Sequence, residues 1–323
     1  MKTRWSNTPS LRKTRWSCTE RQHIRGSQCL VMVKRLCLVA LACVLAACAQ
    51  APAPRAYSDA SRIELLKQLL PADVIMLGEQ HDAADDQRVH RLVVSTLAAQ
   101  NALAALTLEM ASQGQSTANL APDASEEAVR AALKWNNEGW PWAAYGPAVM
   151  AAVRAGVPVI GANLPPERLR EAMANAELDL ALPGPALQVQ QQNIRSGHCD
   201  KLPESQIAPM TRIQIARDIA MAQTLTKALQ PGKTVVLLAG GAHVDRSLGV
   251  PLHMASTLKI KTVLMRAEPI TQEAATAASF DAIWPAQAAP AVDYCARFDA
   301  TRRPPGMGNA NEKQSAIDLT NPR

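Results

Sequence analysis

The 323-residue chain is poor in aromatic side chains and in long apolar runs. Phe, Trp and Tyr together make up 3% of it. The uncharged apolar run from Leu36 to Ala47 has 12 residues, whereas a membrane-spanning helix needs about 20. Low-complexity blocks are absent, and one doubled motif described below is the only internal repeat. The short run argues against a spanning helix at this position.

The same apolar run has the features of an export signal. Lys34 and Arg35 precede it, and the small-residue end "LAA" is followed directly by Cys48, as in a bacterial lipobox. We therefore expect Cys48 to be lipidated, to become the new N-terminus and to anchor the protein to a membrane. The next two residues lack the aspartate that favours retention in the inner membrane, so we expect the outer membrane, with the side left open.

The position of this signal predicts the organisation of the chain. A signal sequence begins within a few residues of its basic region, so we expect translation to start at Met32 and residues 1–31 to be an upstream extension from a misassigned start. The polar end of the chain, rich in Pro and Gly, predicts disorder. The expected order is then a signal peptide at 32–47, a linker at 48–60, one α/β domain at 61–300 and a disordered tail at 301–323.

Neither sign of charge dominates once the leader, residues 1–47, is set aside. The whole chain has a formal net charge of +6 and a pI near 9.0. Residues 48–323 nevertheless carry 25 Lys and Arg against 27 Asp and Glu. The basic balance belongs to the leader and gives no support to nucleic-acid binding, so we expect no nucleic-acid partner.

Cysteine is scarce too, because only Cys48, Cys199 and Cys295 follow the signal. The environment beyond the inner membrane is oxidising, which favours a disulfide between Cys199 and Cys295. Such a bond would tie the C-terminal segment to the body of the protein. Two unpaired thiols are the alternative.

What the sequence does contain is an alternation of short apolar runs with longer stretches of helical spacing. The runs lack the period-two alternation of a half-buried strand, so they predict a sheet buried on both faces. The predicted fold is α/β, with a mostly parallel central sheet flanked by helices and a ligand crevice at the carboxyl ends of the strands. The predicted strands are 74–77, 106–108, 157–161, 234–239 and 262–265, and the clearest helices are 83–100 and 204–229. We expect Asp82 to cap the first helix and Pro209 to kink or divide the second.

One motif occurs twice at strand ends. "LGEQHD" follows the first predicted strand, and "LAGGAHVD" follows the fourth, so Gly-x-x-His is written twice. If these two strands are neighbours, His81 and His243 face one crevice. Glu79 lies within the first motif, and Glu109 and Asn163 directly follow two other strands.

Glutamate and histidine at such a crevice suit several kinds of chemistry. Glu79, His81, Glu109 and His243 could ligate a divalent metal that lowers the pKa of a bound water for hydrolysis. A carboxylate beside a histidine could instead act as a general base without metal. His198 could face a ligand or solvent. His90 and His253 are weaker candidates, since each flanks a probable core.

The few aromatic residues gather in "WNNEGWPWAAYGP", residues 135–147. Such a cluster can wall a flat apolar ligand, and tyrosinate is a known axial ligand of ferric haem. The alternative is a hydrophobic plug over the sheet edge, with the indole N–H groups reaching water.

Taken together, these segments resemble the ChaN family of haem-binding uptake lipoproteins, which shares a superfamily with the Tiki proteins and is similar to erythromycin-esterase-type hydrolases. The resemblance is carried by "LGEQHD" with His90, "LTLEM", residues 140–147 followed by "GVPVIGANLP", "QIARDIAMAQTL" and "GGAHVDRSLGVPLHM".

The resemblance implies haem binding at the cell envelope in iron acquisition. It implies haem held between subunits of a homodimer, with an outer-membrane haem or iron receptor as a partner, and bound through tyrosine and histidine. In this chain the implied cofactor-binding residues are Tyr145, His81, His243, Trp140, Trp142 and His198.

Resemblance to the Tiki proteins instead implies a metal-dependent peptidase that uses Glu79, His81, Glu109 and His243. A third possibility is an inert envelope interaction module that has kept the fold. The sequence supplies both the aromatic wall and the carboxylates, so it does not choose between haem and hydrolysis.

Overall fold

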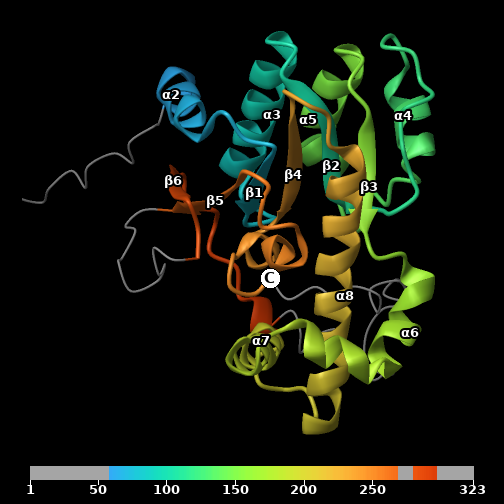
Figure 1. The fold of residues 1–323 in the computed structure, drawn as a ribbon, viewed down its shortest axis with the longest axis vertical. Coiled ribbons are helices and arrows are strands. Elements are labelled where there is room, and N and C mark those ends of the chain that lie inside the picture. The colour runs from blue at the N-terminus through green and yellow to red at the C-terminus, as the bar shows by residue number, and fades with distance from the viewer. Residues whose placement is uncertain (1–57, 268–278, 297–323) are drawn as a thin grey trace, which may run out of the picture. The chain divides into compact units, whose positions relative to one another are not determined.

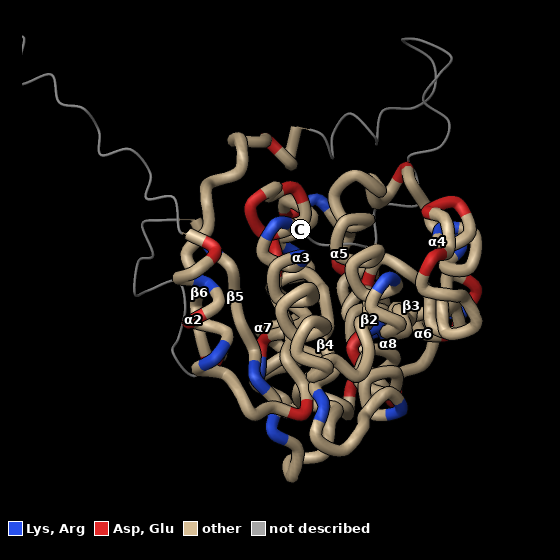
Figure 2. Tube along the Cα trace, turned by 90° about the horizontal axis from the view of Figure 1, so that it is seen from above, with Lys and Arg blue, Asp and Glu red and all other residues tan. Residues whose placement is uncertain are grey.

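The computed structural model describes residues 58–267 and 279–296 (Figure 1). The expected signal peptide, Cys48 and the expected tail lie outside the described residues. Within the described ranges, no helix combines the length and apolar character needed to cross a bilayer. Acidic and basic residues are interspersed along the described trace (Figure 2).

The described residues form a parallel sheet of six strands, ordered β3-β2-β4-β1-β5-β6 (Figure 1). This confirms the predicted fold class. The strands are β1 (Val74–Glu79), β2 (Leu103–Ser112), β3 (Val159–Asn163), β4 (Thr234–Gly240), β5 (Ile260–Ala267) and β6 (Ala282–Ala286). β6 was not predicted because it is short and contains Pro285, which an edge strand tolerates but a central strand does not.

β1 and β4 are neighbours at the centre of the sheet, as the doubled motif required. Their register pairs Glu79 with Gly240. Every residue of both strands is buried, because helices cover both faces of the sheet. Since all the strands run parallel, their carboxyl ends lie along one edge of the sheet.

Helices cover the two faces of the sheet (Figure 1). One face carries α2 (Asp59–Leu69), α3 (Ala84–Ala99), α4 (Glu126–Ala132) and α5 (Trp142–Arg154), and the opposite face carries α8 (Glu204–Ala228). Beyond the carboxyl ends lie α6 (Leu169–Ala174) and α7 (Gly184–Gly197) (Figure 1). Short 3-10 turns include η1 (Pro166–Arg168), η2 (Ala176–Ala181), η3 (Gly241–Val244) and η4 (Val250–His253).

The long helix α8 connects two parts of the core. Its second half packs Met221 and Leu225 against the sheet. Its first half packs Ile207 and Ile213 against α6 and α7, in a separate apolar cluster that includes Ile194. α8 therefore passes directly over the edge where the strands end, and its middle turns face that edge.

Pro209 does not divide α8, which runs unbroken from Glu204 to Ala228, because the proline lies near the helix start and removes a single backbone bond there. The prediction that Asp82 caps α3 was wrong. α3 begins after Ala83, which makes no side-chain cap. Asp82 lies one residue too early to cap it, and accepts hydrogen bonds from Gln80 (2.9 Å) and from the hydroxyl of Tyr294 instead.

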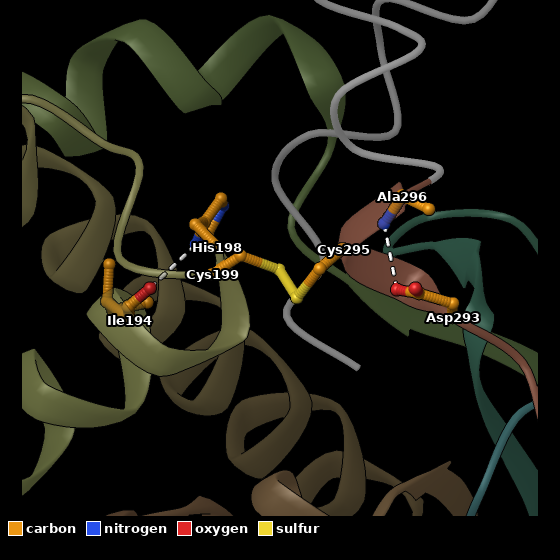
Figure 3. The surroundings of a disulfide bond; sticks show 6 residues. All are labelled: Ile194, His198, Cys199, Asp293, Cys295 and Ala296. Carbon is orange, nitrogen blue, oxygen red and sulfur yellow. Dashed lines mark hydrogen bonds between the residues drawn. A yellow bond between two sulfur atoms is a disulfide. The ribbon is translucent and has the colours of Figure 1, made fainter.

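The cysteines that the sequence left open are bonded in the structure. Cys199 follows α7, Cys295 lies after β6, and an S–S bond of 2.06 Å joins them (Figure 3). The bond spans 96 residues and ties the described C-terminal segment to the layer of α7.

Candidate functional site

The first Gly-x-x-His motif places a carboxylate and an imidazole side by side. Glu79 ends β1 and is buried, and the Nδ1 of His81 lies 2.7 Å from its Oε1. A carboxylate at this distance holds the proton on Nδ1 and leaves Nε2 as the free ring nitrogen. Burial disfavours a charged His81, but Glu109 and Glu79 outweigh it and raise the pKa of this imidazole.

Tyr145 supports the same carboxylate from α5. Its hydroxyl donates to Oε1 of Glu79 at 2.6 Å, and its side chain is buried. Burial and the negative charge of Glu79 raise the pKa of the phenol far above its ordinary value. The structure thus places Tyr145 inside the protein as a neutral donor to Glu79, away from solvent.

His90 lies on the other side of Glu79. It lies on the buried face of α3, and its Nδ1 is 3.5 Å from Oε2 of Glu79. Burial lowers the pKa of His90, so this imidazole is neutral. Within the described residues neither of its ring nitrogens has a hydrogen-bond partner.

The second motif places His243 between two carboxylates that come from other elements. Its Nδ1 lies 2.5 Å from Asp218 on α8, and its Nε2 lies 3.4 Å from Oε1 of Glu109, which lies within β2. Burial disfavours its charge, but Glu109 and Asp218 prevail and raise the pKa of His243 to about 10. His243 is therefore a buried imidazolium held between two carboxylates.

The two motifs meet in one site, as predicted. Glu109 accepts the backbone N–H of Gly240 at 2.7 Å, and the same oxygen lies 4.0 Å from Nε2 of His81. A Cβ on Gly240 would lie 2.9 Å from that nitrogen. Only glycine lets the imidazole of His81 pack this closely against the end of β4.

The predicted aromatic residues separate into two groups. Trp140 contacts His81 edge to face at 4.8 Å and Tyr145 at 5.9 Å between ring centroids. Trp142 instead packs on Trp135 and donates its indole N–H to Glu126 of α4 at 2.9 Å. Trp140 therefore walls the site, whereas Trp142 lies toward the covering helix α4.

A cavity of about 160 Å³ opens beside this cluster. Glu109, Trp140 and Asn163 line it, so three predicted residues share its wall. Asn163 also fixes its own turn, because its side-chain oxygen accepts the N–H of Leu164 at 2.8 Å.

Three site residues on α8 were missed by sequence reasoning. Asp218 clamps His243, Gln214 places its amide 3.1 Å from the same imidazole, and Arg217 lines the cavity. A signal was available, because Gln214 and Asp218 lie four residues apart on the buried face of a helix.

Other candidates lie elsewhere. His198 is buried at the end of α7, where its Nδ1 contacts the carbonyl of Ile194 at 2.8 Å beside the disulfide (Figure 3). His253 belongs to η4. Among residues 58–267 and 279–296, no group of three His, Cys, Asp or Glu side chains is arranged to hold a metal ion. The predicted metal ligands are brought together, but Glu79 and His81 form a hydrogen-bonded pair, and Glu109 and His243 form an ion pair.

Residues 65–254 match the family described as haem-binding uptake, Tiki superfamily, ChaN. The matched range contains the carboxyl-edge site and more than half of the chain. This protein belongs to that family, which confirms the resemblance read from its motifs.

One solved structure shares the fold, and two others are similar over a large part of the chain. The structure of ChaN of Campylobacter jejuni, described as showing cofacial heme binding, aligns with a TM-score of 0.56 and 24% identity. The alignment covers 68% of this chain and 89% of that one. The type III effector HopBA1 (TM-score 0.44, 15% identity) aligns over 72% of this chain and 95% of its own. The erythromycin esterase EreC (TM-score 0.41, 13% identity) aligns over 66% and 74%. Comparison with curated proteins finds no match.

Proposed function

We propose that this protein binds ferric haem at the carboxyl edge of its sheet, as a lipid-anchored envelope protein in iron acquisition. The observation that carries the proposal is the family match, which spans every residue of the site described above. Haem supplies an iron centre and a flat apolar plate, and the residues at this edge suit both.

His81 is the residue that fits the iron. Ligating histidines commonly donate their second ring N–H to a carboxylate, and His81 is oriented in this way by Glu79. Its side chain is 11% exposed, against 1% for His90 and 3% for His243. Nε2 of His81 is the nitrogen that Gly240 leaves room for.

The other expected ligands fit supporting roles in this proposal. Tyr145 would have to leave Glu79 and the protein interior to reach iron. His243 would have to leave both of its carboxylates. Trp140, which touches the ring of His81, offers an apolar wall to the haem face.

The envelope location rests on the sequence. Lipidation at Cys48 would attach the domain to the outer membrane through the linker that precedes α2, and a haem or iron receptor there would supply the ligand. We also propose a homodimer around haem. The cavity beside His81, at about 160 Å³, is too small for a porphyrin, since pockets for drug-sized ligands hold roughly 300–1,000 Å³. The macrocycle would lie at the mouth, where a second copy can cover it.

A titration tests the haem proposal. Residues 49–323 are titrated with ferric haem while the Soret absorption is followed, beside His81→Ala and the matched control His253→Ala. We expect a saturable, shifted Soret band in the wild type and in His253→Ala, and a changed or weakened band in His81→Ala. A featureless wild-type titration would show that the protein is no haem carrier.

A second candidate function, hydrolysis without metal, is favoured by the Glu79–His81 pair. A buried carboxylate that orients an imidazole is the arrangement of a general base. Hydrolysis of a chromogenic ester panel by the wild type, abolished in both Glu79→Gln and His81→Ala, would support it. Turnover that survives both changes, or no turnover at all, would exclude it.

A further inference from the structure

We propose that the cavity beside His81 is a carboxylate-binding subsite, in which Arg217 and Lys134 hold a propionate-type arm of the ligand. The identity of that ligand as haem rests on the function proposed above. The subsite itself rests on the lining, the charge balance and the size of the cavity.

The lining divides into an apolar part and a cationic part. Trp140 and Leu164 contribute apolar surface. Arg217 reaches the cavity from α8 and is 7% exposed, so its guanidinium is largely shielded from water. Lys134 comes from the turn after α4, where a left-handed backbone with φ of 44° redirects the chain. The amides of Asn136 and Asn163 lie between these walls.

The charge balance favours an anion. Glu109 is the one carboxylate on the wall, but its charge is already offset by contacts on the other side. Gly240 donates its N–H to one oxygen, and the imidazolium of His243 lies 3.4 Å from the other. The lining thus holds two cationic side chains, Arg217 and Lys134, against this one carboxylate.

The chemistry of these groups selects a carboxylate. A guanidinium presents parallel N–H donors that match the two oxygens of a carboxylate, and an ammonium adds a point charge. Amide N–H₂ groups add neutral donors. Burial of Arg217 strengthens its interaction with such a group.

The size of the cavity restricts what enters. A volume of about 160 Å³ admits a short acidic chain but excludes a porphyrin ring. The ring and the arm can nevertheless be bound together, because the cavity and the His81 site share two walls. Trp140 touches the His81 ring at 4.8 Å, and Glu109 lies 4.0 Å from its Nε2. A ligand whose centre meets His81 can thus extend an acidic arm toward Arg217.

The test compares ferric haem with haem dimethyl ester, in which both propionates are blocked. Soret titrations in one detergent-containing buffer are made with the wild type, Arg217→Met, Lys134→Met and the control Arg168→Met, an exposed cation of η1 outside this cavity. We expect the wild type and the control to bind haem roughly tenfold to a hundredfold more tightly than the ester, which is the range for a hydrogen bond to a charged group. Each cavity variant should lose most of that preference, with its affinity for the ester unchanged.

Every outcome is decisive. Equal affinity for haem and its ester in the wild type would overturn the subsite and leave haem binding intact. If neither compound shifts the Soret band, the proposed function fails, and thermal stabilisation by succinate then tests the subsite alone. A rise in Tm that Lys134→Met abolishes would support it, and no rise would overturn it. Lys134 is exposed, so its variant keeps the test valid if Arg217→Met does not fold, which circular dichroism will show.

Discussion

Nε2 of His81 occupies the space beside Gly240, where a Cβ would approach it to 2.9 Å. Gly240→Ala must therefore displace the imidazole or the end of β4. Overpacking of this kind typically costs about 1–3 kcal/mol, and we expect haem affinity to fall by about tenfold or more. The Soret titration measures this loss. Gly184→Ala is the control, because a Cβ there meets nothing within 4 Å. Unchanged affinity in Gly240→Ala would show that Nε2 is not the contact to iron.

The variant Tyr145→Phe tests whether Tyr145 supports Glu79 or binds the iron of haem. The change removes the donor to Oε1 of Glu79 while keeping the ring in the core. Hydrogen bonds to charged groups contribute about 1.5–3 kcal/mol, so we expect a destabilisation of that order in denaturant unfolding. The position of the Soret band should stay the same. A lost or shifted band in a folded Tyr145→Phe protein would instead assign the phenol to iron.

The fold was largely readable from the sequence, because a sheet buried on both faces needs continuous apolar runs. β1 and β4 show this directly, since every residue in them is buried. Strand lengths were underestimated where polar residues end a strand, as Glu79 does. β6 escaped because Trp284 and Pro285 resemble neither an apolar run nor an alternating one.

The site was readable only in part, and the reason is distance along the chain. The pairing of His81 with His243 followed from strand ends, which parallel topology brings to one edge. The contact between Asp218 and His243 could not be predicted in this way. Asp218 precedes His243 by 25 residues, and their contact depends on how α8 crosses that edge. The direction of each aromatic ring in residues 135–147 also depends on packing, so Trp140 and Trp142 could not be told apart.

Asp86 makes the stability of the protein depend on pH. This residue of α3 is buried, and its Oδ2 accepts the backbone N–H of Gln80 at 2.9 Å. Burial above all, with Glu79 and Asp85 nearby, raises the pKa of Asp86 to about 7. Between about pH 4 and pH 7, Asp86 is protonated in the folded protein but ionised in the unfolded chain. The free energy of unfolding therefore falls as pH rises through that window.

Asp86→Asn removes that penalty and keeps an oxygen that can accept from Gln80. We expect the variant to be more stable than the wild type at pH 8, by about 4 kcal/mol at most, with the difference vanishing near pH 4. Denaturant unfolding at both pH values measures it, and Asp123→Asn, an exposed position, is the control. A difference that does not change with pH would contradict a titrating Asp86.

The Cys199–Cys295 bond closes a span of 96 residues that includes α8, β4 and β5. Closing a long loop restricts the unfolded chain, and such bonds typically contribute about 2–4 kcal/mol. The bond also holds the segment of Tyr294, whose hydroxyl donates to Asp82 next to His81. We therefore expect the Cys199→Ser, Cys295→Ser double variant to unfold at lower denaturant concentration and to bind haem less tightly.

A dithiol reductant should destabilise the wild type in the same way and leave the double variant unaffected. If the wild type and the double variant unfold together in oxidising buffer, the bond contributes nothing to the fold, and the position of the His81 loop must depend on contacts within the sheet edge alone.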